Sequence, residues 1–347
     1  MPIPTTLISQ PFKTQHYHHA SSVPAAVLDA LRSDIQTERN ANIILPHLLK
    51  CLQKEQHGEP ISANQVWVTC QHGGVLDFVL SCTEGPMGRY PIFIFAAAPF
   101  AQLLDANYVG AAVAALIQQL QRAGVPPERV FSVFAPEPVA QAFACLWRDV
   151  TGVPLAASPE YYAATFSYCN AASFIDSRTS TYDGFTFTPR PAVERDVPFI
   201  AELGKAFSET SPPFVLSYEQ ASKEAEMLVR ERQVWVHEIR QGAGPPDIAS
   251  IVAFTRVSQN VAAITKVFTN PRWRNKGCAL RLVRRVTKHL LKTKEAVVLY
   301  VSHGNPAARV YDQVGFVGLA DDAREFSGVD RWLELGFDQR FVDIGHW

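Results

Sequence analysis

The pattern of hydrophobic residues predicts the same order of helices and strands twice along the chain. In the first half, a helical stretch over residues 25–53 precedes strand-like runs at 66–70, 76–82 and 90–96. The runs are rich in β-branched and aromatic residues, whereas apolar residues of the helical stretch recur at helical spacing. The predicted order then continues helix, strand, helix, strand over residues 107–123, 130–134, 138–149 and 161–168.

The second half repeats this order. A helical stretch over residues 193–232, long enough for two helices, is followed by strand-like runs at 234–239, 248–255 and 261–268. The tetrapeptide Gln65-Val66-Trp67-Val68 recurs as Gln233-Val234-Trp235-Val236 at the start of the first run in each half. Two copies of one α/β unit are therefore predicted. The second copy ends with a helix, a strand, a helix and a strand over residues 278–293, 296–301, 306–314 and 331–337.

Chain length and composition add a domain count and exclude several functions. A chain of 347 residues exceeds the usual size of one hydrophobic core, so we expect domains at 1–170 and 184–347, with the polar stretch 169–184 as the linker. A net charge of −1 does not favour nucleic acid or a membrane surface as a partner. No signal-peptide pattern and no apolar run of about 20 residues is present, so a cytoplasmic protein is expected. Six scattered cysteines lack metal-ligand spacing, so no metal is expected.

The segment 261–279 contains the strongest chemical signal. A strand ends near Phe268, Pro271 breaks it, and a helix begins near Gly277. The small residues Gly277 and Ala279 would let an anion approach the free N–H groups at the start of the helix, where the helix dipole also favours negative charge. The sequence therefore predicts a phosphate-binding loop.

Basic residues surround this loop. Nine Lys and Arg residues and no acidic residue occur between 272 and 294. Arg272, Arg274 and Lys276 adjoin the loop and are expected to contact the anion. The later basic residues are interpreted as a solvated helix face, because Leu282, Val286 and Leu290 already form an apolar stripe.

The loop resembles the acetyl-CoA signature of the GNAT (Gcn5-related N-acetyltransferase) superfamily, Q/R-x-x-G-x-G/A, which reads Arg274-x-x-Gly277-x-Ala279 here. A second block resembles the end of that family's domain, because Tyr311 precedes Gly315-Phe316 after the strand at 296–301. The resemblance implies an α/β fold of two GNAT-like units, each a mixed, mostly antiparallel twisted sheet flanked by helices. The first unit is expected to be degenerate, because residues 96–106 contain Asp105 but no glycine and no basic residue.

The resemblance further implies that an amine, most simply a small molecule, attacks acetyl-CoA directly in a ternary complex. The Val267 N–H would donate to the thioester carbonyl, the backbone at Thr269 would hold the pantetheine arm, and Tyr311 would protonate the leaving thiolate. Tyr311 could instead be a core aromatic residue. The implied cosubstrate-binding residues are Val267, Phe268, Thr269, Arg272, Arg274, Asn275, Lys276, Gly277, Cys278, Ala279, Asn305 and Ala308.

Two features depart from the family pattern. Ala263 stands where many members have a glutamate that acts as the general base. The candidate bases here are therefore Glu238, His237 and His303. Deprotonation through water, or an acceptor amine that is already partly neutral, remains an alternative. The spacing from Asn305 to Tyr311 is one residue short, which weakens the expected role of Asn305. Two alternatives to the small-molecule enzyme stay open: a non-catalytic acyl-CoA-binding or regulatory protein, and an enzyme that acetylates a protein amine. The sequence does not determine the oligomeric state.

Overall fold

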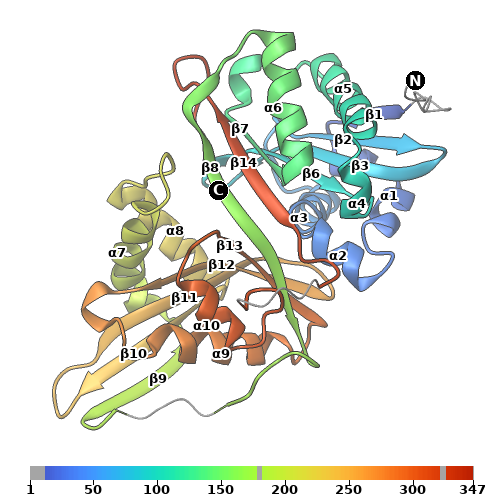
Figure 1. Ribbon diagram of the computed structural model, residues 1–347. Coiled ribbons are helices and arrows are strands. Elements are labelled where there is room, and N and C mark those ends of the chain that lie inside the picture. The colour runs from blue at the N-terminus through green and yellow to red at the C-terminus, as the bar shows by residue number, and fades with distance from the viewer. Residues whose placement is uncertain (1–11, 178–181, 321–325, 347) are drawn as a thin grey trace. The chain divides into compact units, whose positions relative to one another are not determined.

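The computed structural model describes residues 12–177, 182–320 and 326–346 (Figure 1). The chain divides into two compact units, each built from separate segments. Unit 1 comprises Met1–Ser33, Ile43–Tyr161 and Trp332–Trp347, and unit 2 comprises Asp34–Asn42 and Tyr162–Arg331. The N-terminal residues examined for a signal peptide, and residues 178–181 of the expected linker, lie outside the described residues.

Unit 1 is a mixed sheet with helices packed against it. Its strands follow the order β1 (Lys13–Tyr17), β2 (Val66–His72), β3 (Val75–Cys82), β6 (Ile92–Ala96), β7 (Ser132–Pro136), β14 (Arg331–Phe337) and the beginning of β8 (Leu155–Asn170). Only β6 and β7 are paired in parallel among the described registers of this unit. The strands β4 (Glu84–Gly85) and β5 (Gly88–Arg89) form a second, two-stranded sheet. The helices are η1 (Ala20–Ser22), α1 (Ala25–Ala30), α3 (Leu45–Gln56), α4 (Phe100–Leu103), α5 (Ala106–Arg122), η2 (Pro127–Arg129) and α6 (Glu137–Thr151).

Unit 2 repeats the same strand arrangement. Its strands run from β9 (Phe185–Pro191) through β10 (Val234–Gln241), β11 (Asp247–Val257), β12 (Val261–Thr269) and β13 (Ala296–Ser302) to the second part of β8. The pair β12 and β13 is parallel, and the other described pairs are antiparallel. The helices are α2 (Ile35–Ala41), η3 (Glu194–Asp196), α7 (Val197–Ser208), α8 (Tyr218–Arg230), η4 (Pro271–Trp273), α9 (Cys278–Leu290) and α10 (Ala307–Asp312).

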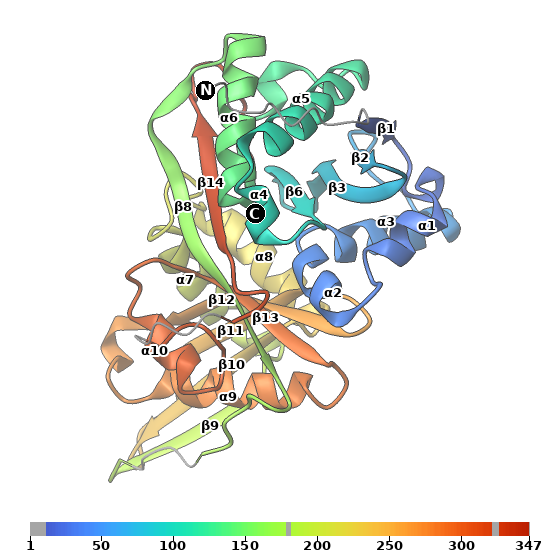
Figure 2. The ribbon, with the colours of Figure 1, turned by 45° about the vertical axis from the view of Figure 1, so that its right-hand side comes forward.

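Alternating residues of the unit 2 strands bury opposite faces of its sheet. Val234 and Val236 of β10 belong to the core under α7 and α8, whereas Trp235 between them belongs to the core under α9. This follows from the period of two in a strand. Helix α9 therefore covers one face, and α7 with α8 the other (Figure 2). The expected mixed α/β fold with mostly antiparallel sheets and flanking helices is confirmed.

The sixth strand of each unit comes from the other half of the sequence. The second part of β8, from the first half, pairs with β13 of unit 2 through residues Ala164–Asn170. Strand β14, at the end of the chain, pairs with β7 of unit 1, where Leu333 lies opposite Ala135. The boundaries 1–170 and 184–347 expected from the sequence therefore do not coincide with the two compact units. Among the described residues, no helix is both long and apolar enough to cross a membrane.

Candidate functional site

Strands β12 and β13 of unit 2 separate part-way along their length. Their parallel pairing covers Val261–Ala263 and Ala296–Val298 and ends there, although β12 continues to Thr269. On its other edge β12 stays paired with β11, and the N–H of Asn270 donates to the Ala249 carbonyl at 2.9 Å. Because successive N–H groups of a strand point to opposite sides, those of Val267 and Thr269 face the side that β13 has left. Two backbone donors therefore line the divergence.

The side chains of Val267, Phe268 and Thr269 contact other parts of unit 2 and not the space between β12 and β13. Val267 packs against the core under α9, and Phe268 is buried in the core under α7 and α8. The Thr269 hydroxyl lies 2.7 Å from the Ser250 hydroxyl. Any contact of Val267 or Thr269 with a molecule between the strands would therefore use the backbone.

A short loop connects β12 to α9 and is anchored by η4. Asn270 accepts a hydrogen bond from the Arg272 N–H, and the indole of buried Trp273 donates to Asp247 at 2.7 Å. Asn275 and Gly277 both adopt left-handed backbone conformations, with φ of 62° and 69°. Glycine tolerates this conformation without a steric penalty, and it leaves the start of α9 free of a side chain.

The N-terminus of α9 has no capping side chain. Gly277 is the N-cap residue, and the first helical bond runs from the Arg281 N–H to the Gly277 carbonyl at 3.1 Å. The N–H groups of Cys278, Ala279 and Leu280 thus have no partner within the helix, and the first turn carries no acidic residue. Cys278 is buried, so it can serve an anion only through its backbone. The arrangement suits a phosphate or pyrophosphate.

The corresponding helix of unit 1, α5, is closed to anions. Asp105 is its N-cap residue, and its carboxylate accepts hydrogen bonds from the N–H groups of Asn107 at 2.9 Å and Tyr108 at 3.3 Å. The donors that stay free in α9 are used here, and a negative charge stands in front of them.

The three basic residues of the loop lie over aromatic rings. The Arg272 guanidinium is 4.8 Å from the Trp273 ring, that of Arg274 is 5.9 Å from the Phe268 ring, and the Lys276 ammonium is 4.7 Å from the Phe185 ring. Arg272 and Arg274 are exposed and Lys276 is half-buried, so their charges are accessible at the loop.

Two of the later basic residues are not on a solvated face, which corrects the interpretation of the sequence. Arg281 is buried, donates to the Lys276 carbonyl and lies 4.0 Å from the Phe187 ring, and burial lowers its pKa. Arg284 is also buried and donates to the carbonyls of Ile175, Ser177 and Gln313. Both guanidinium groups tie loop backbone to α9, a use that helical periodicity does not reveal.

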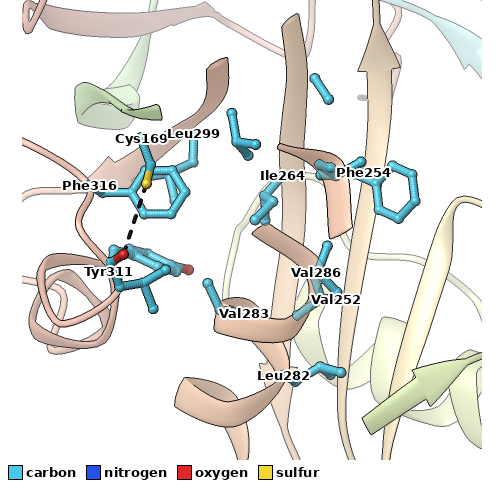
Figure 3. Close-up of a cluster of buried hydrophobic side chains, with 14 of the residues drawn as sticks. Cys169, Val252, Phe254, Ile264, Leu282, Val283, Val286, Leu299, Tyr311 and Phe316 are labelled. Atoms are coloured by element: carbon cyan, nitrogen blue, oxygen red, sulfur yellow. Dashed lines mark hydrogen bonds between the residues drawn. The ribbon is translucent and has the colours of Figure 1, made fainter. Parts of the chain in front are cut away.

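Tyr311 lies on α10 within the core under α9 (Figure 3). Its ring centroid is 6.0 Å from that of Phe316, and burial raises the pKa of its phenol. Among the described residues the hydroxyl has no hydrogen-bond partner. The following turn requires Gly315, because its φ is 103° and an added Cβ would lie 2.0 Å from the Ser173 carbonyl oxygen. Tyr311 is thus a core residue that stays protonated at neutral pH and can donate a proton.

Asn305 is used within its own turn. Its side-chain amide donates to the Ser302 hydroxyl at 3.2 Å, and its side-chain oxygen accepts from the Ala307 N–H at 2.9 Å. The Ala308 N–H donates to the Asn305 carbonyl at 3.0 Å, and half-buried Ala308 packs against the core under α9.

The candidate bases lie in different environments. Glu238 faces α7 and α8 and accepts two hydrogen bonds from Arg190, at 2.9 and 3.2 Å, and Arg190 also pairs with buried Asp196. His237 is fully buried, and burial together with the charge of Arg281 lowers its pKa to about 4. His303 is exposed at the end of β13. Glu238 is engaged in an ion pair with Arg190, and His237 is a weak base. The structure therefore brings neither residue to the divergence of β12 and β13 as an unengaged base.

Comparison with known proteins places this arrangement in a fold family. Residues 247–326 match the model of the FR47-like protein family. A GCN5-related N-acetyltransferase from Sphaerobacter thermophilus superposes with a TM-score of 0.53 at 14% identity, covering 97% of this chain and 98% of that one. A Drosophila protein of solved structure gives a TM-score of 0.57 at 11% identity, covering 94% and 98%. The chain has the GNAT fold.

Further comparisons add little to this result. A tandem GNAT protein from the clavulanic acid biosynthesis pathway covers 93% of this chain and 97% of its own, with 13% identity and a TM-score of 0.49. No curated protein matches the chain significantly. The segment that matches the FR47-like family contains the loop, α9 and Tyr311, so the GNAT fold and the open helix N-terminus occur in the same unit.

Proposed function

We propose that the protein is an acetyl-CoA-dependent N-acetyltransferase that works through unit 2 and acetylates a small-molecule amine. The observation that carries the proposal is the uncapped N-terminus of α9, next to the point where β12 and β13 diverge. This combination would bind a phosphate and an extended chain side by side, and a coenzyme A thioester contains both.

The residues present fit such a molecule. The N–H groups of Cys278, Ala279 and Leu280 would bind the pyrophosphate, which can approach because Gly277 has no side chain. Arg272, Arg274 and Lys276 would add positive charge around it, and the backbone of Asn275 would complete the loop. The N–H of Thr269 would hold the pantetheine amides between the strands. The family resemblance also implies that Val267, Phe268, Asn305 and Ala308 contact the cosubstrate.

Two groups would serve the reaction itself. The Val267 N–H would stabilise the negative charge that develops on the thioester oxygen. The Tyr311 hydroxyl, which lies in the core beside α9, would donate the proton to the leaving sulfur. A thiol with a pKa of about 8.5 leaves readily, so we expect orientation of the reactants to contribute more than proton donation.

Unit 1 would not bind the cosubstrate, because Asp105 occupies the start of α5. The absence of an acid at buried Ala263 supports a second candidate function, a non-catalytic acyl-CoA-binding protein. Acetylation of a protein amine is a third possibility that the same site could serve. We expect neither metal nor nucleic acid to take part.

The decisive experiment is an acetyl-transfer assay on the full chain. The purified protein is incubated with acetyl-CoA and a panel of small primary amines, and the release of free CoA is followed by chromatography. Chromatography is preferable to a thiol-reactive dye, because Cys145 is exposed and would itself react. We expect amine-dependent release, absent from the Gly277→Glu variant. Tight binding of acetyl-CoA without turnover for any amine or peptide would favour the non-catalytic function instead.

A further inference from the structure

Asp330, which directly precedes β14, belongs to unit 2 and is half-buried. Its backbone carbonyl accepts a hydrogen bond of 2.9 Å from the Phe166 N–H, which fixes the residue beside β8. Among the described residues, neither a donor nor a cation lies within bonding distance of its carboxylate. A partly buried carboxylate without a partner is costly, and such groups are concentrated at functional sites.

Asp330 acts on Tyr300, and the side chains around Tyr300 come from three strands of unit 2. Tyr300 of β13 lies opposite Phe166 of β8, with ring centroids 5.0 Å apart. Burial is the main cause of the raised pKa of Tyr300, and the nearby Asp330 and Tyr162 raise it further. The Arg256 guanidinium lies 5.6 Å from the Tyr300 ring and opposes this effect. The Asp330 carboxylate therefore lies near the aromatic rings of Tyr300 and Phe166. Such rings suit an amine that carries an organic substituent.

The position of Tyr300 places this cluster at the divergence of the strands. Val298 is the last β13 residue paired with β12, and Tyr300 follows two residues later. Leu299 and Val301 belong to the core under α9, so Tyr300 points to the opposite face of the sheet. Tyr311 belongs to the core on the α9 side. The two candidate proton-transfer groups, Asp330 and Tyr311, thus serve opposite sides of the divergence.

We propose that Asp330 is the general base of the reaction, and that it accepts the proton of the acceptor amine beside Tyr300. This proposal rests on the acetyltransferase function proposed above and supplies the base that Ala263 cannot. The amine nitrogen forms a bond to the thioester carbon, and one of its protons passes to an Asp330 oxygen. The C–S bond breaks, and the sulfur takes the Tyr311 proton. Both residues then exchange protons with water, which leaves an amide and a free thiol.

The pH dependence has a defined direction. Burial raises the pKa of the Asp330 carboxyl above its ordinary value. The base acts only when ionised, so activity is present above this raised pKa and is lost as the pH falls through it. Of the described residues, Tyr300 is the titratable group on which Asp330 acts, and Arg256 and Tyr162 act on Tyr300 in turn.

The test compares Asp330→Asn with the parent full-length protein, using the best acceptor among benzylamine, glycinamide, glucosamine and spermidine. We expect kcat to fall roughly 100-fold or more, the acidic limb of the kcat/KM profile to disappear, and the Kd for acetyl-CoA to stay unchanged. Asp338→Asn is the matched control, because Asp338 belongs to unit 1 and pairs with Arg340. It should behave like the parent.

A second variant keeps the proposal testable if Asp330→Asn does not fold. Asp330→Ala leaves room for a small carboxylate, so sodium formate should restore part of the lost kcat, whereas sodium chloride should not. An active parent with an undiminished Asp330→Asn variant would overturn the role of Asp330 alone, as would Asp330→Ala activity that formate does not change. A parent that acetylates no amine would overturn the proposed function and this base with it.

Discussion

Gly277 and Asp105 occupy equivalent positions in the two units and have opposite effects. Gly277 has a φ of 69° and offers no side chain, so no side chain caps the first N–H groups of α9. Asp105 accepts hydrogen bonds from the same groups of α5. Under the proposed function, this one residue at the helix start determines whether a unit can bind a phosphate.

Gly277→Glu should weaken acetyl-CoA binding at least tenfold, which corresponds to about 1.4 kcal/mol. The substitution places bulk and negative charge at the helix start, and an added Cβ would lie 3.0 Å from the Arg281 guanidinium. Calorimetric titration measures the effect. Gly242→Glu is the control, because Gly242 also has a positive φ, of 54°, but no neighbour within 4 Å of an added Cβ. Equal affinities for both variants would exclude the phosphate assignment.

Tyr311→Phe should lower kcat roughly 10- to 1,000-fold and leave the KM for acetyl-CoA nearly unchanged. The hydroxyl has no partner among the described residues, and the ring packing against Phe316 is kept, so the stability of the variant should match that of the parent. Steady-state kinetics with a cognate amine decide the question. Parent-like turnover would leave Tyr311 a purely structural residue.

The sequence predicted the loop between β12 and α9 because its residues are contiguous. A glycine directly before a helix indicates an uncapped helix start without information from distant residues. The burial of Arg281 and Arg284, and the surroundings of Asp330, could not be predicted in the same way. The burial of the two arginines depends on carbonyl groups and rings from segments about 100 residues away. Asp330 gains its environment from β8 and β13, and its sequence neighbours give no sign of it.

At the level of elements, prediction succeeded where apolar residues dominate. The strands β12 and β14 and the helices α5 and α9 fall within a few residues of the predicted ranges. The helical stretch 25–53 is three helices, because Ser33 and Asp34 interrupt it and Asp34 caps α2. Strands β1 and β9 were missed, because β1 is largely exposed and polar and β9 contains two prolines.

Asp105→Ala tests the closed helix of unit 1. Loss of the two hydrogen bonds at the start of α5 should lower the free energy of unfolding by about 1 kcal/mol. Urea denaturation followed by circular dichroism measures the change. Acetyl-CoA binding to unit 2 should be unaffected, since the substitution touches only unit 1. A variant as stable as the parent would show that the cap contributes nothing.

At the level of the whole molecule, we expect one acetyl-CoA per chain. Only unit 2 combines an uncapped helix start with basic residues in the preceding loop, as far as the described residues extend. Titration calorimetry or equilibrium dialysis of the full chain gives the stoichiometry. Two equivalents, or one equivalent that survives Gly277→Glu, would contradict the assignment to unit 2.

A fragment of residues 185–347 should be poorly soluble. It lacks β8, so the edge of β13 would be exposed, and it carries β14 without its partner β7. The soluble fraction after expression is the measure, with the full chain as reference. Co-expression with residues 1–184 should restore solubility by supplying both missing strands. A soluble, monomeric fragment would show that neither pairing is needed.

The placement of β14 also determines when each part of the protein can be finished during synthesis. The ribosome produces β7 early, but the strand that pairs with it lies in the last 17 residues of the chain. At ~5–20 residues per second, the β7 edge waits roughly 10 to 40 s for its partner. Unit 2 receives β8 before any of its other strands and can close first. The part of the protein that is made first is therefore the last to complete its sheet, and a stop codon shortly before Trp332 would leave that sheet open.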